Sequence, residues 1–273
     1  MNNTARKGST PVMGSLQNNR AKPYDFLMGD LIRESWVRVN GAKAAYWGAI
    51  GLLFLINIGL ALIGAILGYL LTAFVGGKSG IAIQDVCLVV VWFIDMPLFV
   101  GLFLLSMRRS VDLPIEAKQI FTMFDYFWQI IGLEILILLV VYGVGIAGGF
   151  LIGIFSGVIT ASLGMEPNWA IIIMEVFGVF LVMAMLYFAM AFMFSPLLIV
   201  EKGFGIIQAM KTSFRAFNQH WFKIIVTYFI FIGIYLISAI PLLIGLIWTL
   251  PMMLNFLGIL YRIAFGVEEA RKF

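Results

Sequence analysis

Six long apolar runs dominate this sequence, and each is long enough to cross a lipid bilayer. Roughly 20 helical residues span the hydrocarbon core, so an apolar run of about 18 residues or more predicts a transmembrane helix. The composition agrees, because 62% of the residues are hydrophobic and 12% are charged, against about 25% charged in soluble domains. The expected fold is an all-α bundle whose six transmembrane helices cover residues 45–75, 81–107, 128–160, 169–200, 222–240 and 242–261.

Basic residues fall almost entirely on one side of this predicted membrane. Alternation of the six spans places only Lys78, of the 18 Lys and Arg residues, on the opposite side. Such residues are enriched in cytoplasmic loops, so we expect both termini in the cytoplasm. The polar residues 1–23 lack an apolar signal-peptide region and predict a disordered cytoplasmic tail. Residues 24–266 then form the transmembrane domain, and 267–273 form a second cytoplasmic tail.

A repeat is visible in the segments between the spans. Residues 31–40 and 209–218 align at Ser35 with Ser213, and the two segments also share an aromatic residue and a final asparagine. A third, weaker copy contains Phe121 and Asp125. Each copy is amphipathic and precedes an apolar run, which is typical of a helix lying at the membrane interface. The pattern predicts three repeated helical hairpins, each preceded by an amphipathic interfacial helix.

Proline marks the second helix of each expected hairpin. Pro97, Pro196 and Pro251 are each followed by a large apolar residue. Proline removes one backbone hydrogen bond and kinks a helix, so we expect kinks at these three positions. Freed carbonyl groups bind ions in some transporters, but proline is also common in ordinary membrane helices.

Three polar side chains within the spans form a candidate cluster. Asp95 and Asn57 fall near the middle of the membrane by their distance from the span ends, and Asn255 falls closer to the cytoplasm. Ionisable groups in membrane helices are costly and mark functional sites or buried hydrogen-bonded partners. Asp95 therefore either couples a proton or ion to transport, or holds helices together through an amide or a backbone group.

The third span carries a ladder of glycines at every fourth position. A stripe of this kind lets another helix backbone approach closely. The partner helix lies either within the same chain or in a second molecule, and the sequence leaves both open. The four ladder positions are Gly145, Gly149, Gly153 and Gly157.

Catalysis finds little support in this sequence. The single histidine, His220, has no carboxylate or cysteine cluster near it, and no motif for a metal, cofactor or phosphate site is present in a suitable context. We therefore expect no enzyme activity, no cofactor and no metal. The net charge of +4 follows the membrane topology, so no nucleic-acid partner is expected.

One region resembles a known family. It contains Ser195-Pro-Leu, the segment 208–218, the turn at Pro241 and Tyr261-Arg262, and Pro97-Leu with Gly101 and Arg108 repeats the pattern earlier. In these features most of residues 30–266 resembles a family of uncharacterised proteobacterial multipass inner-membrane proteins. The resemblance implies a bacterial inner-membrane location and brings no established activity.

Two functions from different classes fit these observations. The first is a structural or accessory membrane protein that packs against lipid, a membrane protein complex or a second copy of itself, through the glycine ladder and the basic interfacial helices. The alternative is a small-solute or ion transporter that uses Asp95. A water-filled cavity reaching Asp95 would favour transport, and a dry, packed surround would favour the accessory role.

Overall fold

The computed structural model describes residues 24–75, 79–164, 167–241 and 243–267, so the predicted tails at 1–23 and 267–273 lie outside the described residues apart from Val267. Within these ranges every regular element is a helix. In chain order these are α1 (Met28–Val37), α2 (Lys43–Val75), α3 (Ser79–Ser110), η1 (Ala117–Tyr126), α4 (Phe127–Ser162), α5 (Pro167–Ala191), α6 (Ser195–Lys202), α7 (Ile206–Gln219), α8 (Trp221–Ala239) and α9 (Leu246–Phe265).

Six helical stretches are long and apolar enough to cross a membrane, as the sequence predicted. They are built on α2, α3, α4, α5, α8 and α9, and the fourth stretch continues through α6. The all-α multipass class is therefore confirmed. The boundaries agree within three residues for α2, α3, α4 and α8, whereas α9 covers 246–265 where 242–261 was predicted, and α5 ends at Ala191 and not near residue 200.

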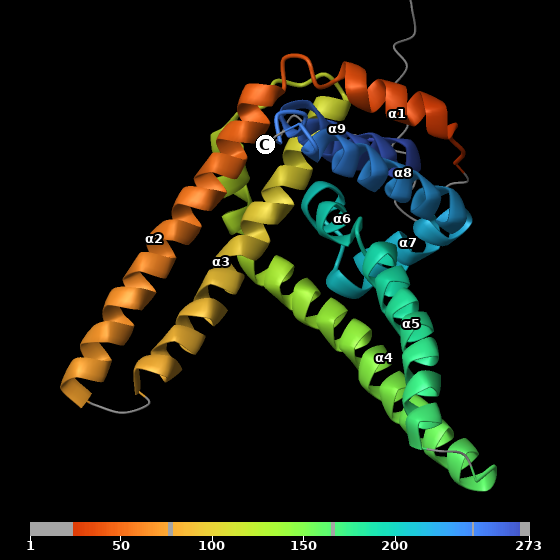
Figure 1. The fold of residues 1–273 in the computed structure, drawn as a ribbon. Helices are drawn as coiled ribbons and strands as arrows, with labels where there is room; N and C mark the ends of the chain where they lie inside the picture. Colours follow the sequence, from red (N-terminus) through yellow and green to blue (C-terminus); the bar gives the residue numbers. More distant parts are fainter. Residues whose placement is uncertain (1–23, 76–78, 165–166, 242, 268–273) are drawn as a thin grey trace, which may run out of the picture.

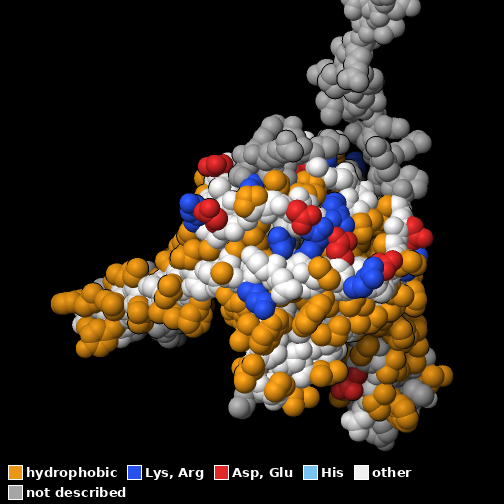
Figure 2. Space-filling view, turned by 90° about the horizontal axis from the view of Figure 1, so that it is seen from above, with side chains coloured by type: hydrophobic (Ala, Val, Ile, Leu, Met, Phe, Trp, Pro, Cys, Tyr) orange, Lys and Arg blue, Asp and Glu red, His pale blue; other side chains and the backbone are white. Residues whose placement is uncertain are grey.

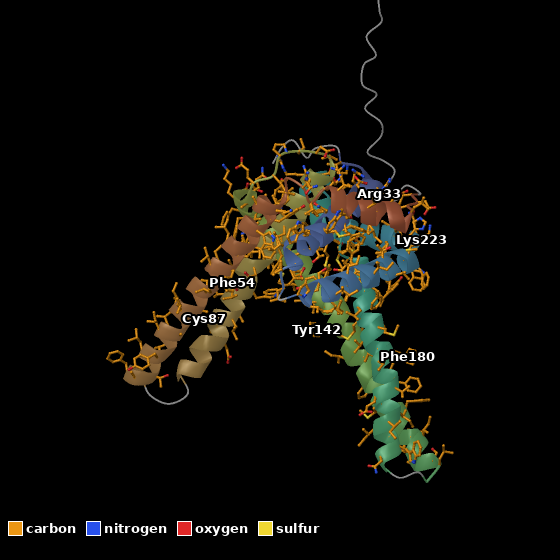
Figure 3. All side chains as sticks on the ribbon, turned by 45° about the horizontal axis from the view of Figure 1, so that its top comes forward. Arg33, Phe54, Cys87, Tyr142, Phe180 and Lys223 are labelled. Atoms are coloured by element: carbon orange, nitrogen blue, oxygen red, sulfur yellow. The ribbon has the colours of Figure 1, made fainter. Side chains whose placement is uncertain are left out.

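The six long helices do not pack side by side as one bundle. Figure 1 shows two long hairpins that diverge from a compact region at one end of the molecule. We call α2 with α3 the first arm, α4 with α5 the second arm, and the region formed by α1, η1, α6–α9 and the adjoining arm ends the head. Figure 3 shows the same divergence from a second direction, so the separation of the arms is not an effect of one view.

The predicted three-unit repeat is present in the fold. Each unit is an interfacial helix followed by a hairpin: α1 with α2 and α3, η1 with α4 and α5–α6, and α7 with α8 and α9. The interfacial helix of each unit packs against the second helix of the unit before it, since η1 contacts α3 and α7 contacts α5 and α6. The contact of α1 with α9 completes the series. The three units therefore close into a ring.

Each junction of this ring contains a close polar or backbone contact. Between α3 and η1, a Cβ added at Gly101 would lie 2.5 Å from Cα of Ile120, so the two helices are nearly in backbone contact. Between α7 and α5, the Ser213 hydroxyl donates to the carbonyl of Ala191 at 2.7 Å. Between α9 and α1, the amide of Asn255 donates to a carbonyl of α1 at 3.2 Å. Small or hydrogen-bonding residues at these points let the units approach.

The core of the head is built from the segments that follow the three prolines. Pro97, Pro196 and Pro251 are themselves buried. The residues after them supply a large share of the buried apolar side chains, among them Leu98, Leu104, Leu105, Met107, Leu197, Leu198, Ile199, Val200, Phe256, Ile259 and Leu260. The parts of α3 and α5 that precede the prolines form the exposed arms, whereas only five residues of α9 precede Pro251. The third unit therefore adds to the head and has no long arm.

The prediction of a kinked helix at Pro196 is wrong. Pro97 and Pro251 lie inside the continuous helices α3 and α9, as expected. At Pro196 the chain instead breaks after Ala191 and starts the separate helix α6, with proline in its first turn. A first-turn residue has no intrahelical use for its N–H, so proline costs nothing there. The Ser213 hydroxyl bridges the break, because it accepts from the N–H of Phe194 at 3.2 Å and donates to Ala191.

The register of the first arm fixes the level at which other helices meet it. Asn57 of α2 lies opposite Asp95 of α3, where their side chains are 2.8 Å apart. Both helices rise about 1.5 Å per residue, and they run in opposite directions. Trp47, ten residues before Asn57, therefore lies at about the same level as Ser106, eleven residues after Asp95.

Helix α9 crosses the first arm at this one level. The indole of Trp47 donates to the carbonyl of Ile247 at 3.2 Å. On the other helix of the arm, α3, Gly258 packs on Ser106 so closely that a Cβ added to this glycine would lie 2.0 Å from the Ser106 carbonyl oxygen. These two α9 residues are about 16 Å apart along their helix. Helix α9 therefore lies across the head end of the first arm and not along its length.

Charged and apolar side chains separate along the molecule. Figure 2 shows Lys, Arg, Asp and Glu gathered over the head, while apolar side chains cover the first arm. Exposed apolar residues also line the second arm, including Tyr142, Ile146, Phe150, Phe180 and Met183. The arms thus carry the surface expected of segments in hydrocarbon, and the head carries the surface expected of a membrane interface.

We expect Gly258→Ala to destabilise the head. The added methyl group would overlap the Ser106 backbone, and overpacking of this kind costs about 2 kcal/mol or more. The matched control is Gly51→Ala in α2, where nothing lies within 4 Å of the added Cβ. Thermal unfolding of both variants in one detergent is the measurement. A midpoint for Gly258→Ala equal to that of Gly51→Ala would contradict the close α3–α9 contact.

Candidate functional site

Asp95 and Asn57, which the sequence singled out, do meet in the first arm. The Asn57 amide donates to a carboxylate oxygen of Asp95 at 2.8 Å and to the carbonyl of Leu53 at 3.0 Å. Both side chains are half-buried between α2 and α3. An amide partner satisfies an acidic side chain within an apolar arm and ties the two helices together.

Asn255 does not join this pair, so the predicted three-residue cluster is wrong at this position. Its side chain is 1% exposed and lies within the head. It accepts from the Tyr46 hydroxyl at 2.7 Å, and it donates to the carbonyl of Ser35. Asn255 therefore joins α9 to the end of α1 and the start of α2. The cause is the crossing of α9, which keeps its middle at the head end of the first arm.

The glycine ladder is divided between an internal contact and open space. A Cβ at Gly145 would lie 3.0 Å from Met185 of α5, and one at Gly149 would lie 4.0 Å from Leu181. At Gly153 and Gly157 nothing lies within 4 Å. The half nearer the head thus packs against α5 within the chain, and the half farther from the head leaves a bare helix face on the second arm.

An ionic cluster in the head was not predicted from the sequence. Glu34 of α1 accepts from Arg38 at 2.7 Å and from Arg262 of α9 at 2.9 Å. Arg38 also contacts Asp112 after α3 at 2.7 Å. Burial by itself raises the pKa of Glu34, but the hydrogen bonds from the two guanidinium groups outweigh it and lower that pKa below its ordinary value. The cluster holds α1 against the ends of α3 and α9.

One signal for this cluster is visible in the sequence, because its member Arg262 has a counterpart at the same distance from a proline in another unit. Arg108 and Arg262 each lie eleven residues after a proline. Arg108 donates to the carbonyl of Pro114 at 3.2 Å, and Arg262 donates to the carbonyl of Ser110. Both guanidinium groups therefore hydrogen-bond backbone carbonyls close to the end of α3. Their shared distance from proline reflects a shared structural role.

The described residues include no group of three or more His, Cys, Asp or Glu side chains placed to hold a metal ion. His220 lies at the junction of α7 and α8, where its ring contacts the carbonyl of Tyr24 and packs edge-on against the Tyr24 ring. The Asp25 carboxylate nearby is 2.6 Å from the ammonium of Lys223. These contacts fix the segment before α1 onto the start of α8.

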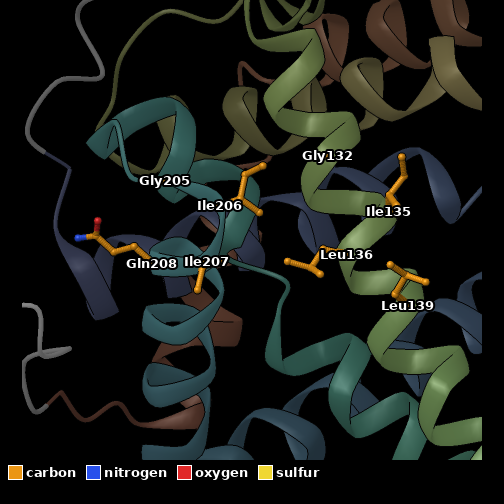
Figure 4. A pocket seen from close by; sticks show the side chains of 8 residues that line it. All are labelled: Gly132, Ile135, Leu136, Leu139, Gly205, Ile206, Ile207 and Gln208. Atoms are coloured by element: carbon orange, nitrogen blue, oxygen red, sulfur yellow. The ribbon is translucent and has the colours of Figure 1, made fainter.

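Apolar hollows lie beside both arms. One, of about 570 Å³, runs along the first arm and reaches Asn57, but its other lining residues, among them Phe54, Leu60 and Leu88, are apolar. Figure 4 shows a second hollow, of about 550 Å³, between α4 and the start of α7. There Leu136 points from α4 toward the chain around Ile206. Sequence reasoning missed this second hollow because it depends on how α7 is placed against α4.

We expect Glu34→Gln to lower thermal stability at pH 7, because it removes the charge that pairs with Arg38 and Arg262. A carboxylate whose pKa is lowered by folding stabilises the fold fully above its unfolded pKa of about 4.3, and this contribution is lost as the pH falls through the lowered value. The gap in unfolding midpoint between wild type and variant should therefore close in acid. Glu116→Gln, at an exposed surface pair with Lys118, is the control and should change the midpoint little. A gap that persists unchanged in acid would refute the role of the Glu34 charge.

A double-mutant cycle tests the Asp95–Asn57 bond. Asn57→Leu should destabilise the arm because it leaves the Asp95 carboxyl without its amide partner. Asp95→Leu should do the same to Asn57, and the double variant should recover a coupling energy of about 0.6 kcal/mol, the typical size for hydrogen bonds between membrane helices. Strictly additive effects would mean that the bond contributes nothing to the pairing of α2 with α3.

Comparisons of this chain with models of protein families, with curated proteins and with solved structures find no match.

Proposed function

We propose that this chain is a structural or accessory integral membrane protein, without catalytic activity, that packs against lipid and a membrane protein complex. The observation that carries the proposal is the projection of two long apolar arms from one packed head (Figure 1). The most apolar stretch of α9 is half buried, whereas the corresponding stretches of the α4 and α5 spans contain no buried residue. The second arm therefore offers its apolar surface to whatever surrounds it.

The bare half of the glycine ladder supports a protein contact on this arm. Gly157 is exposed and Gly153 half-buried, and no atom lies near a Cβ added at either. Helix association in lipid depends on close van der Waals packing, for which small residues are enriched at contact faces. A helix of a partner complex, or a second copy of this chain, would approach closely here.

The transport alternative gains less support from the geometry. Transport through Asp95 would require a water-filled path to its carboxylate. The hollow that reaches its partner Asn57 is lined chiefly by apolar side chains, and the Asp95 carboxylate already accepts the Asn57 amide. This pair is better suited to holding α2 and α3 together.

The proposal includes a bacterial inner-membrane location with both termini in the cytoplasm. The one-sided distribution of Lys and Arg supports this orientation, which places the head at the cytoplasmic face. The resemblance of residues 30–266 to uncharacterised proteobacterial inner-membrane proteins supports the same membrane.

The test is a pull-down of the tagged chain from native membranes without detergent. Gly157→Leu should abolish recovery of a defined partner, because leucine fills the open face of the second arm at a position where no atom lies within 4 Å of an added Cβ. Gly59→Leu on the first arm, where an added Cβ also has no atom within 4 Å, is the matched control and should retain the partner.

Asp95→Asn, tested both in this pull-down and in a solute uptake assay, separates the two functions. The accessory role predicts that this variant keeps both its partner and its stability, since asparagine can still accept the Asn57 amide hydrogen bond. Recovery of every variant without any partner would contradict the protein-complex part of the proposal. A loss of solute uptake with Asp95→Asn would support transport instead.

A further inference from the structure

We propose that the groove between α4 and α7 binds one anionic phospholipid, with an acyl chain along its apolar walls and the phosphate on Lys211 and Arg215. The inference rests on the proposed function, because it assigns the lipid-packing part of that function to a defined site. It concerns the head end of the second arm, whereas the protein contact proposed above concerns the glycine face farther along α4.

Helix α7 presents two different faces. Ile207, Lys211 and Arg215 are exposed and follow one another at four-residue intervals, so they form one stripe along the helix. The opposite face carries the buried Ser213 and Phe217, which pack into the head. The basic stripe is therefore held in place by a packed helix and not by a loose segment.

Two adjoining hollows lie between this stripe and α4. The first, of about 550 Å³, includes Gly132 and Leu139 of α4 in its lining, and the second, of about 440 Å³, includes Lys211 and Arg215. They adjoin because both are lined by Leu136 and Ile207. Each volume falls within the roughly 300–1,000 Å³ of typical ligand pockets. Apolar side chains and two basic side chains thus border one continuous groove.

The groove starts near headgroup depth on α4. Trp128, one residue inside the start of α4, is 79% exposed, and indole prefers the headgroup region. Gly132 and Val140 of α4 line the groove about 6 Å and 18 Å farther along the helix axis. The groove therefore extends from near headgroup depth along α4, and Lys211 and Arg215 border the hollow that Val140 also lines.

Charge selects the headgroup. Two neighbouring cations on one helical stripe complement a phosphate that carries net negative charge, and basic pockets between membrane helices on the cytoplasmic side bind such headgroups. A zwitterionic lipid also carries a cationic group, which the same two side chains would repel. Phosphatidylglycerol is therefore the matching probe, and phosphatidylcholine with the same acyl chains is the control.

The test measures lipid retention on the purified full-length chain by native mass spectrometry after titration with each of these two lipids. The wild type should retain one phosphatidylglycerol in preference to phosphatidylcholine. The double variant Lys211→Gln with Arg215→Gln should bind phosphatidylglycerol about 30-fold more weakly, given the usual contribution of a basic residue near an anionic surface. The matched control is Arg33→Gln with Lys118→Gln, which removes two exposed basic residues from the other two interfacial helices and should leave binding unchanged.

A second variant tests the apolar wall. Leu136→Trp places a larger side chain where the two hollows meet, so it should displace the acyl chain while both basic residues remain. Glycerol phosphate without acyl chains should compete weakly with the lipid if the groove is used. Equal retention of the two lipids by the wild type, or unchanged phosphatidylglycerol binding in the double variant, would overturn the proposal. Either result would leave the Gly157 pull-down unaffected, so failure of this site is distinguishable from failure of the proposed function.

Discussion

The close approach of α9 to α3 is the contact on which the rest of this structure depends. Gly258 brings one helix almost onto the Ser106 backbone of the other, and this contact places α9 across the head end of the first arm. In that position α9 receives α1, so the third unit joins back to the first. Without this closure, the third unit would lose its junction with the first, and the three units would be joined in a row only through η1 with α3 and α7 with α5 and α6.

The head and the arms are stabilised by different interactions. The head buries apolar side chains after each proline and satisfies charged groups within it, as Glu34 does with Arg38 and Arg262. The arms bury little, and their stability in lipid comes from complete backbone hydrogen bonding within each helix and from local contacts such as Asn57 with Asp95. This division leaves arm surfaces for lipid and protein contacts, while the basic stripe of α7 stays at the head.

The sequence predicted some contacts of the candidate site residues and not others. Asp95 and Asn57 were predicted to meet because they lie at similar depths on consecutive helices, and a hairpin necessarily brings such residues together. The third member, Asn255, was placed closer to the cytoplasm than the other two from its distance to the end of its span. Because α9 crosses the head end of the first arm, Asn255 binds Tyr46 and Ser35 there and does not reach Asp95. The division of the glycine ladder likewise depends on where α5 contacts α4, which glycine spacing does not encode.

The sequence by itself determined the helical membrane class, the six apolar helices and the three-unit repeat, because hydropathy over about 20 residues and local amphipathic periodicity are properties of short segments. Tertiary structure alone decided that the arms diverge, that the chain breaks before Pro196 and that α4 and α7 enclose a groove. These features depend on packing between residues far apart in the chain. Ser213 shows the reason: its hydroxyl joins α5 and α6 only after α7 has folded back against them.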